Sequence, residues 1–291
     1  MSPASMSGKT CIVTGANSGI GKETALGLAQ MGARVVMVCR NSEKGEAALD
    51  EIRRESGSSQ VDLLIADMSS QASVRLLAEQ IQRKYPRLDV LVNNAGGAAL
   101  ARTISADGIE MTLATNHLGA ALLTLLLLDL LKASAPSRIV NVSSSEHQSP
   151  TRLDTNDLQF ERRKYSAVAA YRQSKLLMNA FTFELARRLA GTGVTANCLH
   201  PGAVATNIWN PDLLPPLIGK LMVALVKQFL MNSKRGAAVS LYLATSPEVA
   251  QVSGEYFVKL KPAKSNPLSR DPKLMAEVWL CTAKMISLPL A

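Results

Sequence analysis

Short runs of β-branched and apolar residues alternate along the chain with longer runs in which apolar residues recur every three or four positions. The short runs are typical of buried strands and the longer ones of amphipathic helices. Such alternation builds right-handed βαβ crossovers, which place the strands parallel in one sheet with helices on both faces. The sequence therefore predicts an α/β fold with a doubly wound parallel sheet. The predicted strands are 10–15, 33–39, 61–67, 88–94, 137–144 and 193–200, and the predicted helices are 18–31, 43–56, 70–84, 109–132 and 166–190.

The whole chain, residues 1–291, is predicted to be a single domain, because no flexible linker or charge block interrupts its first 200 residues. Residues 7–200 are expected to form the core. Residues 203–232 are rich in Leu, Met and Pro, which favours a helical lid over an apolar site, with a plain packing helix as the alternative. Residues 233–291 are expected to add a helix near 234–245, a last strand near 254–258 and a tail.

Charge and hydropathy exclude several classes of protein. The net charge of +9 is explained by scattered solvated Lys and Arg, with attraction of a polyanionic cofactor or of anionic lipid as alternatives. Nucleic-acid binding is not expected, because no such motif is present and aromatic residues make up only 4% of the chain. The chain shows no signal peptide, and its most apolar run, 118–131, contains Asp129 and is shorter than a membrane span. A cytoplasmic protein is expected, with peripheral membrane contact through 213–231 left open.

The side chains that bind metals or attack carbonyls are not arranged for either task. The histidines are dispersed without paired carboxylates, so no metal site is expected. No GxSxG motif supports triad hydrolysis. The cysteines are far apart and mostly inside apolar runs, which favours buried reduced thiols. These residues are His117, His147, His200, Cys11, Cys39, Cys198 and Cys281.

A glycine-rich turn, TGANSGIG, joins the first predicted strand to the first predicted helix. Glycine lets the chain turn sharply beside a ligand, and the helix N-terminus offers free N–H groups and a partial positive charge. A strand before the turn and a helix after it match the pyrophosphate site of a Rossmann-type dinucleotide-binding fold, with a structural turn as the alternative. The expected cofactor contacts here are Gly15, Asn17, Ser18, Gly19, Ile20 and Gly21.

The second and third predicted strands end in residues that bear on the adenosine half of such a cofactor. The second strand lacks the usual acidic residue that binds ribose: Cys39 stands there and Arg40 follows. A guanidinium can make charge-assisted contacts with a 2′-phosphate, so NADP(H) is predicted over NAD(H), with an ordinary exposed arginine as the alternative. Asp67 could accept a hydrogen bond from the adenine amino group or could cap the following helix.

Tyr171 and Lys175 stand four residues apart in YRQSK and are predicted to share one helix face. For proton exchange near neutrality, the ammonium would have to lower the tyrosine pKa by about three units, or roughly 4 kcal/mol. A solvated pair on a helix surface is the alternative. The fifth predicted strand ends in Ser143, Ser144 and Ser145, and a hydroxyl at that edge of the sheet could hold a substrate carbonyl oxygen.

Taken together, these motifs resemble the short-chain dehydrogenase/reductase family. The matching stretches are TGANSGIG, Asp67, NNAG, ATNHLG, NVSSS, YRQSK and HPGAVAT, while CRN, NHLG, ELARRLAGTGVTANCLHPG and the long interval before YRQSK resemble the retinol dehydrogenase-like branch. The resemblance implies Asn116, Ser144, Tyr171 and Lys175 as catalytic residues, with Ser145 as a substitute for Ser144. It also implies cofactor contacts from Met68, Asn94, Ala95, Gly96, Pro201, Gly202, Val204 and Thr206, in addition to Tyr171, Lys175 and the residues named above.

The resemblance further implies hydride transfer between NADP(H) and the carbonyl or alcohol carbon of a small apolar substrate, such as a retinoid or another lipophilic aldehyde. Tyr171 would protonate the substrate oxygen and Ser144 would hold it. Lys175 would lower the tyrosine pKa and bind the nicotinamide ribose, and Asn116 would anchor a water that relays protons. A homodimer or homotetramer is also implied. The alternative function is an NADP(H)-binding regulatory or scaffold protein with little turnover, which has no need for all four residues.

Overall fold

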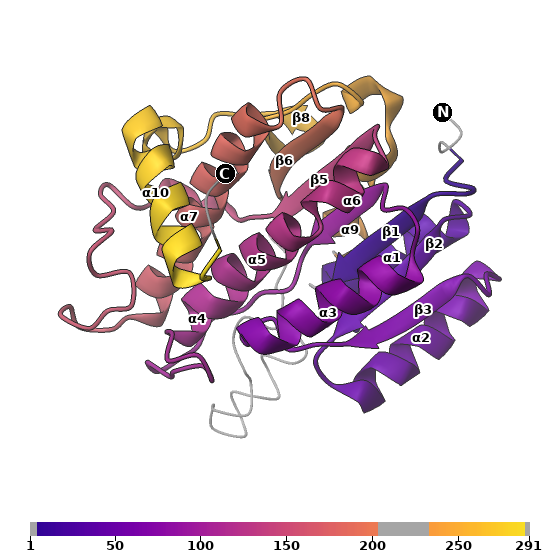
Figure 1. The fold of residues 1–291 in the computed structure, drawn as a ribbon, viewed down its shortest axis with the longest axis horizontal. Coiled ribbons are helices and arrows are strands. Elements are labelled where there is room, and N and C mark those ends of the chain that lie inside the picture. Colours follow the sequence, from indigo (N-terminus) through magenta and orange to yellow (C-terminus); the bar gives the residue numbers. More distant parts are fainter. Residues whose placement is uncertain (1–4, 203–232, 289–291) are drawn as a thin grey trace.

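A computed structural model of the 291-residue chain describes residues 5–202 and 233–288. In these residues, one sheet of eight strands in the order β3-β2-β1-β4-β5-β6-β7-β8 runs through the molecule, with helices on both faces (Figure 1). Strands β1 to β7 pair in parallel and β8 is antiparallel to β7. The strands are β1 (Thr10–Thr14), β2 (Arg34–Cys39), β3 (Val61–Ile65), β4 (Val90–Asn93), β5 (Ser137–Val142), β6 (Val194–His200), β7 (Tyr256–Val258) and β8 (Lys261–Pro262).

The helices follow the strands in the alternating order that the sequence predicts. They are α1 (Gly19–Gln30), α2 (Ser42–Ser56), α3 (Gln71–Lys84), α4 (Met111–Leu113), α5 (Gly119–Leu126), α6 (Leu128–Ala133), α7 (Ala167–Arg188), α9 (Ser233–Thr245) and α10 (Pro272–Met285). A π-helical turn, η1 (Ala114–Leu118), lies between α4 and α5, and the short 3₁₀ turns are η2 (Ser145–Gln148), η4 (Pro247–Val249) and η5 (Pro267–Arg270).

Two apolar cores lie on the two faces of the sheet. Successive side chains of a strand point to opposite faces, so Ile12 packs with residues of α3, α5, α7 and α10, whereas Val13 packs with residues of α1, α2 and α9. Both side chains are 0% exposed. Burying an aliphatic side chain of this size contributes roughly 1.5–3 kcal/mol, so the covered strands hold the helices firmly against the sheet.

The fold class predicted from the alternation is confirmed, and the predicted elements lie within a few residues of the observed ones. One helix was expected over 109–132, but the structure breaks it at the π-helical turn and again at Leu127, where ψ is 4°. Within the apolar run 118–131, residues 118–124 are buried, whereas Asp129 is exposed. Helix α10 was not predicted. The expected lid, residues 203–232, lies outside the described residues.

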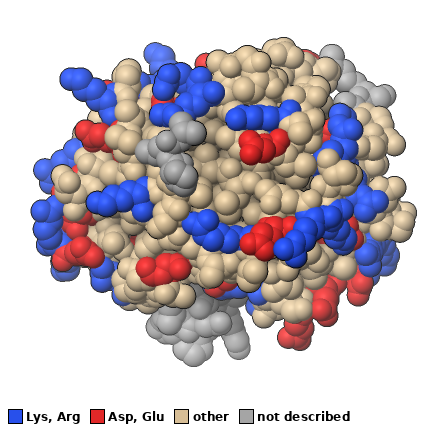
Figure 2. Space-filling view, in the orientation of Figure 1, with Lys and Arg blue, Asp and Glu red and all other residues tan. Residues whose placement is uncertain are grey.

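The charged surface and the cysteines agree with the predictions of scattered charges and buried thiols. On the face shown in Figure 2, Lys and Arg lie among Asp, Glu and uncharged residues rather than in one continuous patch. Cys11, Cys39 and Cys198 are buried and free, as predicted, while Cys281 is half-buried. No helix within the described ranges is long and apolar enough to cross a bilayer.

Candidate active site

A cleft of about 480 Å³ opens where the parallel strands end, at the edge of the sheet where folds of this type bind their ligands. It brings the glycine-rich turn together with Tyr171 and Lys175, which lie more than 150 residues further along the chain. The predicted site residues that line it are Gly15, Asn17, Ser18, Gly19, Ile20, Gly21, Arg40, Asp67, Met68, Asn94, Ala95, Gly96, Tyr171, Lys175 and Pro201. Gly202 is not among the lining residues, and Val204 and Thr206 lie outside the described residues.

The glycine-rich turn presents the N-terminus of α1 to this cleft. Gly15 has φ +66°, and a Cβ on Gly21 would lie 2.3 Å from the Gly15 carbonyl oxygen, so the strand, turn and helix pass too closely for larger residues. In the described part of the chain, the N-cap residue Ser18 makes no side-chain cap hydrogen bond, whereas the N-caps of α2, α3, α7 and α10 each accept one. The first N–H groups of α1 are therefore available to an anionic group such as a phosphate.

Thr14, which was not predicted as a site residue, locks the turn to the neighbouring NNAG segment. Its hydroxyl oxygen accepts hydrogen bonds from the backbone N–H groups of Asn94 at 2.9 Å and Ala95 at 3.0 Å. The side-chain amide of Asn94 donates in return to the Thr14 carbonyl at 2.8 Å. The sequence feature that could have identified Thr14 is its position as the last strand residue before the glycines. A hydroxyl there can bind the backbone that crosses from the next strand.

Arg40 and Asp67 are the two side chains that the sequence predicts to bind the adenosine half of a dinucleotide. Arg40 is exposed at the end of β2 and lines the cleft. The Asp67 Oδ1 accepts hydrogen bonds from the N–H of Ser69 at 2.9 Å and its hydroxyl at 2.8 Å, while Oδ2 has no recorded partner within residues 5–202 and 233–288. Ser70 rather than Asp67 caps α3. The Asp67 carboxylate therefore keeps an oxygen available to a ligand.

Tyr171 and Lys175 lie on α7, one turn apart, with the lysine Nζ 5.6 Å from the tyrosine ring centroid. Lys175 is 4% exposed, and its Nζ donates a hydrogen bond to the Val142 carbonyl at 2.9 Å. Burial lowers the pKa of Lys175 to about 8. Lys175 is therefore shielded from water and Tyr171 is half-buried, so the two are not a solvated pair on a helix surface.

The pKa of Tyr171 is raised, whereas the sequence predicts that Lys175 lowers it. Burial raises the pKa of Tyr171 above its ordinary value and the charge of Glu146 adds to this rise, against a hydrogen bond with Ser144 that lowers it. The expected lowering by Lys175 is not found, because the ammonium bonds to Val142 and lies over the ring instead of at the phenol oxygen. The protein alone thus holds Tyr171 as the neutral phenol.

The three serines at the end of β5 have different surroundings. Ser144 is the one whose hydroxyl bonds to Tyr171, and its Oγ also accepts the N–H of Glu146 at 3.2 Å. Ser143 is buried with its hydroxyl toward the Lys175 carbonyl at 3.5 Å. Ser145 is exposed. Of the three serines, Ser143 lines the cleft and Ser144 is the partner of the Tyr171 phenol.

Asn116 is 1% exposed and lies in the π-helical turn, a feature common at functional sites. Its Oδ1 accepts the N–H of Gly97 at 2.8 Å, and its Nδ2 donates to the Gly97 carbonyl at 2.8 Å and to the Ser174 hydroxyl at 2.9 Å. The side chain does not line the cleft. It ties the segment after NNAG to α7, on which Tyr171 and Lys175 lie.

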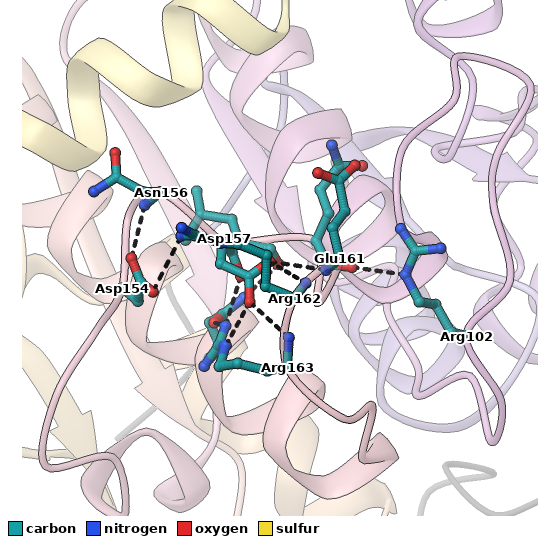
Figure 3. Close-up of polar contacts among 10 residues, drawn as sticks. Arg102, Asp154, Asn156, Asp157, Glu161, Arg162 and Arg163 are labelled. Atoms are coloured by element: carbon teal, nitrogen blue, oxygen red, sulfur yellow. Dashed lines mark hydrogen bonds and ion pairs between the residues drawn. The ribbon is translucent and has the colours of Figure 1, made fainter.

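The long interval between Ser144 and Tyr171 folds into a compact loop whose structure the sequence did not predict. Figure 3 shows its centre, where the buried Asp157 carboxylate accepts hydrogen bonds from the Glu161 N–H at 2.8 Å and from the Arg163 Nε at 2.9 Å. The Arg102 Nε donates to the Gln159 carbonyl at 2.9 Å and joins the loop to the segment after NNAG. Hydrogen bonds therefore hold the loop together and attach it to α7.

Tyr165, near the end of this loop, connects it to the cleft itself. Its hydroxyl donates to the carbonyl of Ala99, a cleft residue, at 2.8 Å, and lies 3.2 Å from the buried Glu110 carboxylate. Thr112, another cleft residue, accepts the Ala99 N–H at 3.1 Å. These contacts fix the Ala-rich side of the cleft.

The comparisons with known proteins define the class. A family model described as short chain dehydrogenase matches residues 9–156, and the chain belongs to the short-chain dehydrogenase/reductase family of oxidoreductases. Human retinol dehydrogenase 13 is 43% identical over 293 residues, which cover 99% of this chain and 87% of that protein. Human retinol dehydrogenase 14 is 42% identical over 299 residues, covering 98% and 88%. Within the family, the chain lies in the retinol dehydrogenase-like branch.

Solved structures agree with this assignment. An uncharacterized protein from Mycobacterium paratuberculosis matches with a TM-score of 0.81 and 33% identity over 99% of this chain and 98% of that one. The Pseudomonas aeruginosa RhlG/NADP active-site complex matches with a TM-score of 0.67 and 28% identity over 88% and 97%. The family uses nicotinamide cofactors.

Proposed function

We propose that the protein is an NADP(H)-dependent oxidoreductase that interconverts the carbonyl and alcohol forms of a small apolar substrate. The observation that carries this proposal is the single cleft that joins the N-terminus of α1 to Tyr171 and Lys175. The relatives named retinol dehydrogenase support a retinoid or another lipophilic aldehyde or ketone as the substrate. The bound nicotinamide would supply or accept the hydride.

The residues present fit a phosphorylated dinucleotide. The uncapped N-terminus of α1 would bind the pyrophosphate, and Arg40, exposed at the cleft, would bind a 2′-phosphate. Asp67 would bind the adenine amino group through its Oδ2, which has no partner among the described residues. The other predicted cofactor contacts belong to the same proposal: Met68, Asn94, Ala95, Gly96, Pro201, Gly202, Val204 and Thr206.

The surroundings of each side chain support the catalytic roles that we propose. Tyr171, held as the neutral phenol, would donate its proton to the substrate oxygen during reduction, and Ser144 would hold that oxygen by its hydroxyl. Lys175, charged below its pKa of about 8, would stabilise the phenolate that remains. Asn116 would keep the cleft wall and α7 in register through its three hydrogen bonds.

The test is a paired assay of NADPH and NADH oxidation over aldehydes of graded chain length, with Tyr171→Phe as the matched variant. We expect turnover with NADPH for apolar aldehydes, and a loss of roughly 10²–10⁴-fold in kcat for Tyr171→Phe with NADPH binding retained. NADPH binding by a wild-type protein that reduces none of the aldehydes would instead support the regulatory or scaffold alternative. The expected cytoplasmic location and homo-oligomer stay predictions, which cell fractionation and light scattering would test.

A further inference from the structure

The three histidines of the chain lie near Asn116 or near the turn that begins at Ser144. His117 follows Asn116 in the π-helical turn, and His147 is three residues after Ser144. The His200 Nδ1 accepts the N–H of Ser145 at 3.1 Å. None of the three takes part in the proposed proton transfer. Two of them, His117 and His147, are at most 1% exposed and contact the same distant part of the chain.

The two ring nitrogens of His147 bind groups whose hydrogen-bonding roles are fixed. Its Nδ1 lies 2.5 Å from the Ser144 carbonyl oxygen, which can only accept, and its Nε2 lies 3.2 Å from the Asn266 backbone N–H, which can only donate. The ring is therefore neutral, with its proton on Nδ1. Burial, which lowers the pKa of His147, favours the same neutral form. A neutral imidazole in this tautomer thus connects Ser144 to Asn266.

Asn266 strengthens this connection with its side chain. Its Nδ2 donates to the carbonyl oxygens of His147 at 3.0 Å, Gln148 at 3.2 Å and Pro150 at 2.8 Å. Its Oδ1 accepts the N–H of Leu268 at 2.9 Å, which caps η5. The turn that begins at Ser144 is therefore bound at four atoms by a residue more than 100 positions away.

His117 makes the corresponding contact with α10. Its Nε2 lies 2.7 Å from the Thr282 hydroxyl, and its ring packs edge-on against Phe181 at 5.8 Å between centroids. Phe181 in turn stacks on Trp279 of α10 at 5.4 Å. Burial lowers the pKa of His117 to about 3, so this ring is also neutral. Helix α10 therefore reaches the π-helical turn that holds Asn116.

We propose that the C-terminal segment, residues 264–288, positions Ser144 and Asn116 through these histidines. His147, held by Asn266, is the positioning residue for Ser144, and His117, held by Thr282, is the positioning residue for Asn116. The proposal rests on the proposed function. Ser144 bonds to the catalytic phenol, so a small displacement of its turn misplaces the hydroxyl that holds the substrate oxygen. A displacement of about 1 Å in an active site can reduce the rate by roughly 100-fold.

The test compares two substitutions at His147 that keep different halves of the contact. His147→Asn places an amide N–H where Nδ1 lies and keeps the bond to the Ser144 carbonyl. His147→Gln reaches toward Asn266 and gives up the bond to Ser144. We expect His147→Gln to lose on the order of 10–100-fold in kcat and His147→Asn to keep most of it, with the NADPH dissociation constant unchanged in both.

Thr282 offers a second matched pair. Thr282→Ser keeps the hydroxyl that faces His117, and Thr282→Val keeps the shape but removes it. We expect a lower kcat only for Thr282→Val, with NADPH binding retained. Thermal unfolding of all four variants is measured in parallel, because a purely structural role would make activity follow stability.

The outcomes separate this inference from the proposed function. An active wild type with equal kcat in the two members of each pair would overturn the positioning role and leave the proposed function intact. Losses that follow the unfolding temperature instead of the retained contact would also overturn it. A wild type that reduces no carbonyl compound would overturn the proposed function, and the inference with it.

Discussion

Thr14→Val is the substitution whose effect the structure determines most directly. The side chain is 1% exposed, and valine matches threonine in shape while lacking the hydroxyl. The change would therefore leave the packing of β1 intact and remove one oxygen. That oxygen accepts the backbone N–H groups of Asn94 and Ala95, so both donors would lose their partner.

The magnitude follows from those two donors. A buried donor without an acceptor costs about 1–3 kcal/mol, so two would cost about 2–6 kcal/mol. Asn94 and Ala95 are only half-buried beside the cleft, so water can reach them and the lower end applies. We expect Thr14→Val to reduce the free energy of unfolding by about 2–3 kcal/mol. It should also weaken NADPH binding, because these residues line the cleft.

Urea unfolding followed by circular dichroism measures this change, and Thr14→Ser is the control. Serine keeps the hydroxyl and loses one methyl group, which costs about 1 kcal/mol. We expect Thr14→Ser to bind NADPH as the wild type does. If Thr14→Val proves as stable as Thr14→Ser, the two hydrogen bonds do not hold the cleft and the reasoning is refuted.

Three further substitutions test the cofactor, the buried lysine and the tyrosine. Arg40→Asp should reduce the preference for NADPH over NADH by roughly 10–100-fold in kcat/KM, the value of a charge-assisted bond, and an unchanged ratio would remove the 2′-phosphate contact. The pKa of Lys175 falls from 10.5 to about 8, so the unfolded chain binds more protons between these values and stability rises with pH across that window. Lys175→Met removes this penalty of about 3 kcal/mol, so the inactive variant should be more stable than the wild type in urea at pH 7 but not above pH 10.5. Because Glu146 raises the pKa of Tyr171, Glu146→Gln should move the pH profile of alcohol oxidation, which needs the phenolate, to lower pH; a profile that stays in place would contradict this coupling.

The sheet could be predicted from the sequence because its strands and helices show different spacings of apolar residues. The glycine-rich turn and YRQSK could be placed at the same edge of the sheet because the carboxyl ends of parallel strands share it. Most of the residues predicted to bind the cofactor indeed line one cleft, although their contact with a cofactor stays a proposal. The spacing of apolar residues and the short motifs were sufficient to predict the sheet and the place of the cleft.

The features that could not be predicted depend on contacts between distant residues. The direction of the Tyr171 pKa follows from burial and from Glu146, neither of which the spacing of YRQSK reveals. The loop around Asp157 is held by hydrogen bonds that no short motif predicts. Asp271 and Pro272 are a favourable N-cap and first residue, so the start of helix α10 was predictable from the sequence. Its packing against α7 joins distant residues and could not be predicted from local sequence.

The late position of Asn266 and Thr282 has a consequence for the order in which the protein matures on the ribosome. Every described cleft residue except Ser233 is synthesised by residue 201, but the supports of the two buried histidines emerge only near the end of translation. Nascent chains halted at increasing lengths should therefore gain affinity for NADPH before they gain turnover.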